Sequence, residues 1–232
     1  MEITGYKDFY KQDKLSIYNM DNMELMKQIP DKYFDISLID PPYGIGEDGS
    51  KNNTRGNLAI SKNYKAYAGN DKTPPEQNFF NELFRISKNQ IIFGANHFID
   101  LINKKSSCWI VWDKDNGDTD FADCELAWTS FSTAVRKIKY KWQGMLQNDM
   151  SNKETRIHPN QKPINLYSWI LEKYAKEGMK IFDSHLGSGS NAIACHYAEM
   201  EFIGCELDED YYNDSIKRIK ENTRQLSLLN LG

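Results

Sequence analysis

Short apolar runs alternate with amphipathic segments along most of the chain, and this alternation restricts the fold more than any other feature of the sequence. The runs LSIYN, FDISLID and KIFD, at 15–19, 34–40 and 180–183, have the length and the apolar content of strands. The amphipathic stretches that predict helices lie at 21–29, 74–88, 96–104 and 164–175. Strands that alternate with helices are typical of an α/β fold, in which helices cover both faces of a sheet. The run at 34–40 is mostly apolar, so we expect it near the centre of that sheet.

The remaining segments fit the same architecture. Strands are expected at 90–94 and 108–114, and the segments 124–131 and 134–142 are interpreted as the two arms of a hairpin. Near the C-terminus a strand, a glycine-rich turn, a helix, a strand and a helix follow one another. No internal repeat or interdomain linker interrupts the 232 residues, a length that suits one domain.

Charge is distributed unevenly along the chain. The formal net charge of −4 neither requires nor excludes a nucleic-acid partner, because the placement of charge matters more than its total. The segment 136–162 contains seven basic residues against two acidic ones. The polar stretch 47–75 is longer than an ordinary connection, and its basic residues include Lys51, Arg55, Lys62 and Lys65. Both segments are candidates for phosphate contacts, although a merely solvated loop explains 47–75 equally well.

The cysteines and the apolar content indicate the compartment. Cys108, Cys124, Cys195 and Cys205 show neither C-x-x-C pairing nor a histidine at zinc-ligand spacing, so we interpret them as buried thiols in a reducing environment and expect no metal. No apolar run is long enough to form a signal core or to span a bilayer. The sequence therefore predicts a cytoplasmic protein without a membrane partner.

The segment from Asp40 to Tyr43 ends the expected central strand with a carboxylate, two prolines and an aromatic ring. The two prolines restrict the turn, so that a side-chain carboxylate and a backbone carbonyl are held in fixed positions as hydrogen-bond acceptors. Fixed acceptors of this kind can hold the two N–H bonds of a planar amine while its nitrogen attacks an electrophile. In isolation, a strand-ending turn with a capping Asp and a surface Tyr is an equal interpretation.

A glycine-rich turn between 182 and 190 predicts a nucleotide-cofactor site. Gly187 and Gly189 allow close approach of the backbone to a ligand, and Glu206 ends the next strand, where a carboxylate can accept hydrogen bonds from ribose hydroxyls. The segment 187–192 also satisfies the dinucleotide pattern G-x-G-x-x-A, so a dinucleotide stays open at this point. Asp183 argues against it, because a carboxylate there would repel a pyrophosphate and suits a cationic ligand such as an ammonium group.

Four motifs together resemble the amino-group (adenine-N6 or cytosine-N4) DNA methyltransferases. They are DPPY (40–43), HPNQKP (158–163), FDSHLGSGS (182–190) and IGCELDEDYY (203–212), and their order is similar to the permuted β class. The resemblance implies an α/β, three-layer, Rossmann-like fold with a seven-stranded mixed sheet that binds S-adenosylmethionine. It implies one catalytic domain over 1–232, with 47–75 and 136–162 as candidate DNA-recognition elements. His185 and Ser190 depart from the usual family pattern.

The resemblance also implies roles for individual residues. The catalytic set consists of Asp40, Pro41, Pro42 and Tyr43, with the Tyr43 ring as a stacking surface for a base extruded from the duplex. The implied cofactor-binding residues are Asp21, Asp40, Lys162, Phe182, Asp183, Ser184, Gly187, Ser188, Gly189, Ser190, Glu206 and Leu207. Asp21 reads equally well as a helix N-cap, and Lys162 equally well as part of a plain loop before a helix.

The expected function is therefore methyl transfer from S-adenosylmethionine to the exocyclic amine of adenine in double-stranded DNA. The first residue of the DPPY motif, Asp, favours adenine over cytosine in this family. Cytosine-N4, RNA or protein-glutamine methylation, non-catalytic binding of S-adenosylmethionine or DNA, and a dinucleotide oxidoreductase are the alternatives. A homodimer and a cognate restriction endonuclease are compatible partners.

Overall fold

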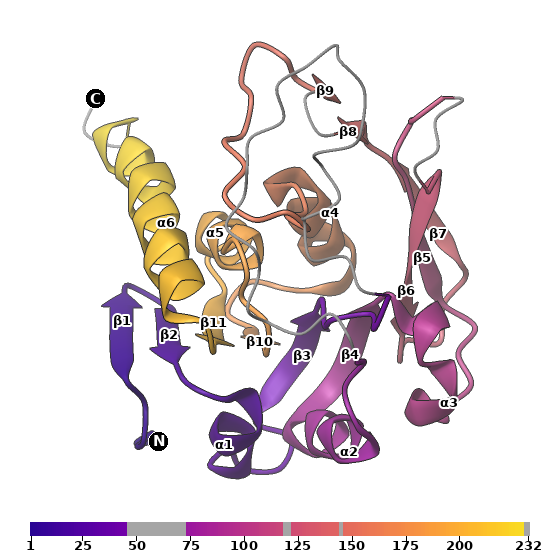
Figure 1. The fold of residues 1–232 in the computed structure, drawn as a ribbon, viewed down its shortest axis with the longest axis vertical. Helices are drawn as coiled ribbons and strands as arrows, with labels where there is room; N and C mark the ends of the chain where they lie inside the picture. The colour runs from indigo at the N-terminus through magenta and orange to yellow at the C-terminus, as the bar shows by residue number, and fades with distance from the viewer. Residues whose placement is uncertain (46–72, 118–121, 144–145, 230–232) are drawn as a thin grey trace.

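A nine-stranded sheet forms the centre of the protein in the computed structural model, which describes residues 1–45, 73–117, 122–143 and 146–229 (Figure 1). Its strands are β1 (Asp8–Gln12), β2 (Leu15–Asn19), β3 (Phe34–Ile39), β4 (Ser87–Phe93), β5 (Trp109–Asp113), β6 (Cys124–Thr129), β7 (Arg136–Lys139), β10 (Lys180–Asp183) and β11 (Glu201–Glu206). They are arranged in the order β1-β2-β11-β10-β3-β4-β6-β5-β7. The five strands from β2 to β4 run parallel, so their carboxyl ends lie at one edge.

Helices cover both faces of the sheet (Figure 1). On one face lie α1 (Asn22–Lys27), α2 (Gln77–Ile86) and α3 (Ile99–Ile102), the last preceded by a 3₁₀ turn at Ala95–His97. On the other lie α4 (Ile164–Tyr174), α5 (Ser190–Tyr197) and α6 (Glu209–Leu229). A two-stranded ribbon of β8 (Trp142–Gln143) and β9 (Leu146–Gln147) stands apart from the main sheet. In the part of the chain that the structure describes, no helix is long and apolar enough to cross a membrane.

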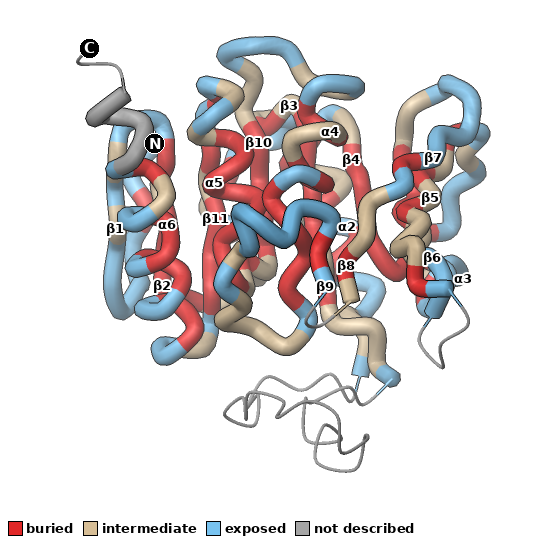
Figure 2. The backbone as a smooth tube through the Cα atoms, turned by 90° about the horizontal axis from the view of Figure 1, so that it is seen from above, coloured by how far each residue is buried: buried red, intermediate tan, exposed pale blue. Residues whose placement is uncertain are grey.

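The alternation of side chains along the central strands divides the core into two layers. Leu38 of β3 packs with the α4 and α5 side, whereas the next residue, Ile39, packs with the α1 and α2 side. On β4, Phe93 and Ile92 divide in the same way. Strands buried on both faces need apolar residues at nearly every position, which is why these runs are so apolar. Figure 2 shows the buried residues concentrated in the strands and in the helices that cover them.

The α/β class, the three layers and the central position of 34–40 are confirmed, but the expected number of seven strands is wrong. One extra strand is β1, which forms a hairpin with β2 through a two-residue turn at Asp13 and Lys14. Asp13 has φ +49°, a left-handed conformation that Asp tolerates in turns. The mostly exposed β1 lacks the apolar pattern that identifies a buried strand.

The expected hairpin of 124–131 with 134–142 is also wrong. β6 pairs with β4 and β5, whereas β7 pairs in parallel with the far side of β5. The strand β5 therefore lies between the two segments. The apolar faces of β5 and β6 allow them to be buried side by side, and the alternation of apolar and polar residues does not specify which neighbours pair. The helix expected at 96–104 is reduced to the 3₁₀ turn and the single turn of α3.

Candidate active site

The predicted site residues meet at the carboxyl edge of the parallel strands. Asp40 directly follows β3, Asp183 ends β10 and Glu206 ends β11. Because β3, β10 and β11 are consecutive neighbours in the sheet, the three carboxylates follow one another along that edge. In open α/β sheets this edge is where ligands bind. The DPPY motif and the glycine-rich turn, about 140 residues apart in the sequence, therefore lie at the same edge of the sheet.

Both carboxylate oxygens of Asp40 have partners. Oδ1 accepts a hydrogen bond from the Tyr43 hydroxyl at 2.8 Å, and Oδ2 contacts the Lys162 ammonium at 2.5 Å. The Tyr43 hydroxyl also lies 3.2 Å from Glu125 Oε2 and accepts from Lys162 Nζ at 3.1 Å. The Asp40 side chain is 18% exposed and that of Lys162 only 4%. The Asp40 carboxylate, the predicted acceptor, therefore already contacts Tyr43 and Lys162.

Glu125 and Lys114 extend this arrangement into a chain of alternating charges. Lys114 Nζ contacts Glu125 Oε1 at 2.5 Å, and Lys162 Nζ contacts Glu125 Oε2 at 3.1 Å. We call Lys114, Glu125, Lys162 and Asp40 the charge chain. Glu125 lies near the start of β6, which runs antiparallel to β4, so its side chain reaches the same edge as Asp40. The local pattern predicted only a strand at 124–131, and nothing in it indicated a site residue.

Burial and the neighbouring charges set the ionisation of this chain. Burial would raise the pKa of Glu125, but Lys162 and Lys114 outweigh it and lower that pKa to about 2. Burial raises the pKa of Asp40, which Lys162 opposes. Burial disfavours the charged form of Lys162, but Asp40 and Glu125 outweigh it and raise its pKa. Glu125 is therefore an anion and Lys162 a cation at neutral pH.

Gly94 makes room for the Tyr43 ring. It follows β4 with φ +66°, and a Cβ atom built there would lie 2.0 Å from Tyr43 Cε1. The Tyr43 ring also stacks on the exposed His97 ring, with centroids 5.2 Å apart and planes 16° apart. Burial, with Asp40 and Glu125 alongside, raises the pKa of Tyr43 well above its ordinary value, so its hydroxyl keeps its proton. The sequence pattern identified Tyr43 but neither of its ring neighbours.

Asn191 connects the Asp40 strand to the predicted cofactor strand. Its Nδ2 donates to the Leu38 carbonyl at 2.9 Å and to Asp183 Oδ2 at 3.0 Å. Asp183 Oδ1 accepts from the His185 backbone N–H at 3.0 Å. Asp183 is 2% exposed, and burial, only partly opposed by these hydrogen bonds, raises its pKa to about 7. A buried carboxyl of this kind is favoured as an anion once a cation binds beside it.

The glycine-rich turn holds Glu206 through backbone donors. Glu206 Oε2 accepts from the Gly187 N–H at 3.0 Å, and Oε1 accepts from the Asp208 N–H at 3.1 Å. Burial outweighs these bonds and raises the pKa of Glu206 to about 7. Gly187 and Gly189 have φ of +52° and +75°, in the left-handed region that glycine adopts without a steric penalty. A Cβ at Gly189 would also lie 3.0 Å from the Ile219 side chain.

The serines of this turn are fixed by a buried arginine. Arg218 Nη1 donates to the Ser188 carbonyl at 2.8 Å and to Ser190 Oγ at 3.0 Å. Its Nη2 pairs with Glu154 at 2.7 Å, and Glu154 Oε1 accepts from the N–H of Ile164 at the start of α4. The turn, α6 and the segment before α4 are thus joined, a connection that the sequence did not indicate.

Four further predicted residues have other neighbours. Asp21 is the N-cap of α1 and accepts from the N–H groups of residues 23 and 24. The Phe182 ring packs in the core against Phe34, with centroids 4.9 Å apart. Ser184 Oγ lies 2.8 Å from His185 Nδ1, and Leu207 is 58% exposed. Contact of these residues with a cofactor stays a prediction.

Of the predicted DNA-contacting residues, Lys51, Arg55, Lys62 and Lys65 lie outside the described residues. In the basic segment 136–162, three lysines pair with acidic residues at the end of β5 and just after it. Lys137 contacts Asp113 at 3.0 Å, and Lys139 and Lys141 contact Asp115 at 2.8 and 3.7 Å. Together with the buried Lys162, these pairs remove much of the local excess of positive charge.

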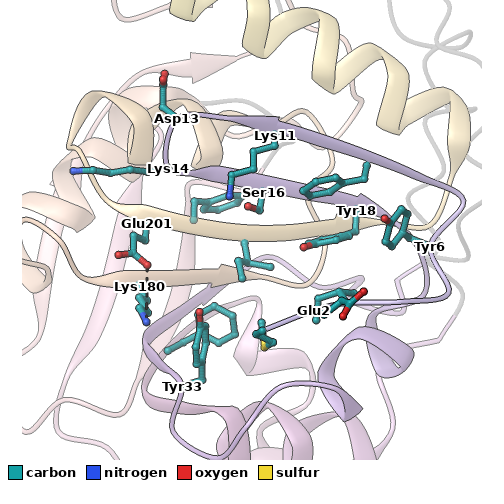
Figure 3. Close-up of a pocket in the computed structure, with 16 residues that line it drawn as sticks. Glu2, Tyr6, Lys11, Asp13, Lys14, Ser16, Tyr18, Tyr33, Lys180 and Glu201 are labelled. Carbon is teal, nitrogen blue, oxygen red and sulfur yellow. Dashed lines mark ion pairs between the residues drawn. The ribbon is translucent and has the colours of Figure 1, made fainter.

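A concavity of about 570 Å³ lies elsewhere on the sheet and contains none of the predicted residues (Figure 3). Its lining includes Tyr6 and Tyr18 on one side, and Lys180 and Glu201, the first residues of β10 and β11, on the other.

Comparisons with known proteins show similar sequences and the same fold. The chain is 25% identical over 260 residues to the type II methyltransferase M2.MboI of Moraxella bovis, covering 96% of this chain and 93% of that protein. The crystal structure of the M1.HpyAVI–SAM complex superposes with a TM-score of 0.55 at 20% identity, over 88% of this chain and 99% of that one. The PvuII DNA methyltransferase (cytosine-N4-specific) gives a TM-score of 0.57 at 13% identity, over 94% of both chains.

The family model described as DNA methylase, N6_N4_Mtase, matches residues 50–217. This match covers more than half of the chain and includes the HPNQKP segment, the glycine-rich turn and Glu206. The chain therefore belongs to the N6/N4 DNA methylase family.

Proposed function

We propose that the protein transfers a methyl group from S-adenosylmethionine to the exocyclic amine of adenine in double-stranded DNA. The observation that carries the proposal is the juxtaposition of Asp40 with Asp183 and Glu206 at the ends of three neighbouring strands. The Asn191 bridge between β3 and Asp183 holds the two halves of this site together. An amine-binding acceptor and a nucleoside-binding carboxylate are therefore neighbours on one rigid edge.

The Asp40 turn suits an amine whose lone pair is delocalised into an aromatic ring. The Asp40 carboxylate can accept one N–H and the Pro41 carbonyl the other, which favours a pyramidal nitrogen. Two consecutive prolines fix the acceptors before the substrate binds, so little reorganisation is needed during the reaction. Tyr43 supplies an aromatic surface for a base extruded from the duplex.

The residues around the glycine-rich turn fit S-adenosylmethionine. Glu206, held by two backbone N–H groups, would accept hydrogen bonds from the ribose hydroxyls, and Asp183 would lie beside the ammonium group. When bound, S-adenosylmethionine would supply a methyl group on a sulfonium; overall, one N–H bond would be exchanged for an N–C bond, the S–C electron pair would remain on sulfur as a thioether, and the proton would pass to solvent. The chain itself holds the amine, and the Asp40 carboxylate stabilises the positive charge that develops on its nitrogen.

The proposal is tested by incubating the protein with labelled S-adenosylmethionine and long, mixed-sequence DNA that carries no methylated bases. Digestion to nucleosides and mass spectrometry should identify N6-methyladenine. Detection of N4-methylcytosine would show that the target base is cytosine and not adenine, because the same acceptors can hold either amine. Transfer to RNA or protein but not to DNA would refute the proposal.

Replacement of Glu206 by Gln should weaken binding of S-adenosylhomocysteine roughly 10- to 100-fold, the range for hydrogen bonds to a charged group. Gln keeps the shape of the side chain but loses the charge and one acceptor. Isothermal titration calorimetry measures the affinity. Glu201→Gln is the matched control, because Glu201 begins the same strand and its side chain is 52% exposed. Equal affinities of the two variants would remove the ribose assignment.

Cofactor affinity should rise as the pH increases from about 5.5 to 7. The pKa of Asp183 lies near 7 in the free protein, so at lower pH this carboxyl is mostly protonated and must lose its proton when an ammonium group binds beside it. Glu206, with a pKa also near 7, acts in the same direction. Each group contributes up to about tenfold per pH unit below its pKa.

Calorimetry at pH 6 in buffers of different ionisation enthalpy should detect this proton release. Asp183→Asn should bind more weakly and release fewer protons. The Asp183 assignment fails if the variant releases as many protons as the unmodified protein.

A further inference from the structure

An amine that binds Asp40 competes with two existing contacts for the charge of the carboxylate. Its Oδ1 is bonded to Tyr43 and its Oδ2 to Lys162. The Lys162 side chain is 4% exposed, and leaving a buried ammonium without an anion is strongly unfavourable. A site in which Asp40 was the sole partner of Lys162 would therefore resist binding of the amine.

Glu125 supplies a second anion for the same ammonium. Lys162 Nζ lies 3.1 Å from Glu125 Oε2 and 3.1 Å from the Tyr43 hydroxyl. The ammonium also lies 4.8 Å from the centroid of the Phe93 ring, a further favourable contact for a cation. Lys162 would thus remain paired and hydrogen-bonded if its contact with Asp40 were lost.

We propose that Glu125 is a positioning residue that retains Lys162 while Asp40 exchanges its Lys162 contact for an N–H of the target amine. The inference rests on the proposed function, because it assigns the amine to Asp40. It gives Lys162 the role of a counter-ion that keeps Asp40 ionised and oriented before the base arrives. Glu125 acts through Lys162 and touches neither the base nor the cofactor.

The balance of charge explains why a second carboxylate is useful here. The amine nitrogen gains positive charge as it attacks. If Lys162 were paired with Asp40 alone, the two would form a neutral ion pair, which would do little to stabilise that charge. With Glu125 included, Lys162 is shared between two anions, and Asp40 retains negative charge toward the amine. Lys114, on the far side of Glu125, balances the surplus anion of the resting site.

The first test compares Glu125→Gln and Glu125→Asp with the unmodified protein. The Gln variant should lower kcat roughly 10- to 100-fold, while affinity for S-adenosylhomocysteine stays within about threefold. The Asp variant keeps the charge and should lie closer to the unmodified protein. Equal activity of the Gln and Asp variants, or full activity of Glu125→Gln, would overturn the proposal. If the unmodified protein transfers no methyl group to DNA, the proposed function fails instead.

A double variant separates this role from a merely structural one, because Glu125→Gln also deprives Lys114 of its partner. If the defect came from an unpaired Lys114, then Lys114→Met combined with Glu125→Gln would restore activity. The proposal predicts that the double variant stays as slow as Glu125→Gln, and that Lys114→Met alone is slowed far less. Recovery in the double variant would overturn it.

A measurement without cofactor or DNA completes the test. The carboxyl carbons of ¹³C-labelled aspartate report the titration of Asp40, whose signal is identified by its loss in Asp40→Asn. The like charge of Glu125 raises the pKa of Asp40, and without Glu125 the Lys162 ammonium pairs with Asp40 alone. The Asp40 titration should therefore move to lower pH in Glu125→Gln but not in Glu125→Asp. An unchanged titration in both variants would overturn the proposal.

Discussion

Replacement of Asp40 by Asn should lower kcat for methyl transfer roughly 10²- to 10³-fold, with little change in cofactor affinity. The substitution keeps the shape of the side chain but removes negative charge where positive charge develops on the amine. One fixed group of this kind contributes about 3–4 kcal/mol to the barrier. An Asn side chain has one acceptor oxygen and one NH₂ donor group. Lys162 and the amine, which are both donors, would therefore compete for that single oxygen.

Asp35→Asn is the matched control for this prediction. Asp35 lies near the other end of β3, and it too pairs with a lysine, Lys88, at 2.7 Å. The same chemical change there should lower stability, because Asp35 also accepts from the Lys180 backbone N–H, but should leave kcat within about twofold. Calorimetric binding of S-adenosylhomocysteine verifies that both variants are folded. An Asp40→Asn enzyme that keeps a tenth of the original turnover would refute the amine-clamp assignment.

The strand-end position of the Asp40 turn and of the glycine-rich turn could be predicted from the sequence, because each follows a short apolar run directly. In a parallel sheet, a residue that ends a strand must lie at the carboxyl edge. For the same reason Glu206 and Asp183 were correctly expected at that edge. At these positions the local apolar pattern and the overall fold agree, so the pattern alone places the residues at the correct edge of the sheet.

Glu125 could not be predicted, because its role comes from pairing between strands. It reaches Lys162 only because β6 runs antiparallel beside β4, and the sequence led to a different pairing, the hairpin with 134–142. The motif at 158–163 did identify Lys162, but as a residue for the cofactor. The three-dimensional arrangement puts its ammonium between Asp40 and Glu125, and its contact with a cofactor stays a prediction. Contacts between residues this distant in the chain depend on topology, which periodicity does not encode.

Gly94→Ala should have an effect second only to that of Asp40→Asn. An alanine there would require φ near +66° and would put its Cβ about 2.0 Å from the Tyr43 ring. The left-handed conformation costs about 1–2 kcal/mol, and overpacking typically adds 1–3 kcal/mol. The ring cannot shift freely, because its hydroxyl is bonded to Asp40 and lies 3.1 Å from Lys162. We therefore expect a loss of roughly 2–5 kcal/mol in the free energy of unfolding and at least a 100-fold loss of kcat.

Gly178→Ala separates the two causes. Gly178 has φ +78°, and among the described residues no atom lies within 4 Å of a Cβ built there. This variant should show only the cost of the left-handed conformation and should keep full activity. In a Tyr43→Ala background the ring is absent, so Gly94→Ala should then destabilise the protein no more than Gly178→Ala does. Urea unfolding of the four variants measures this coupling. If Gly94→Ala lowers the free energy of unfolding by the same amount with and without the Tyr43 ring, the contact between Gly94 and the ring does not hold the Tyr43 hydroxyl at Asp40. Tyr43 must then be positioned by the charge chain alone.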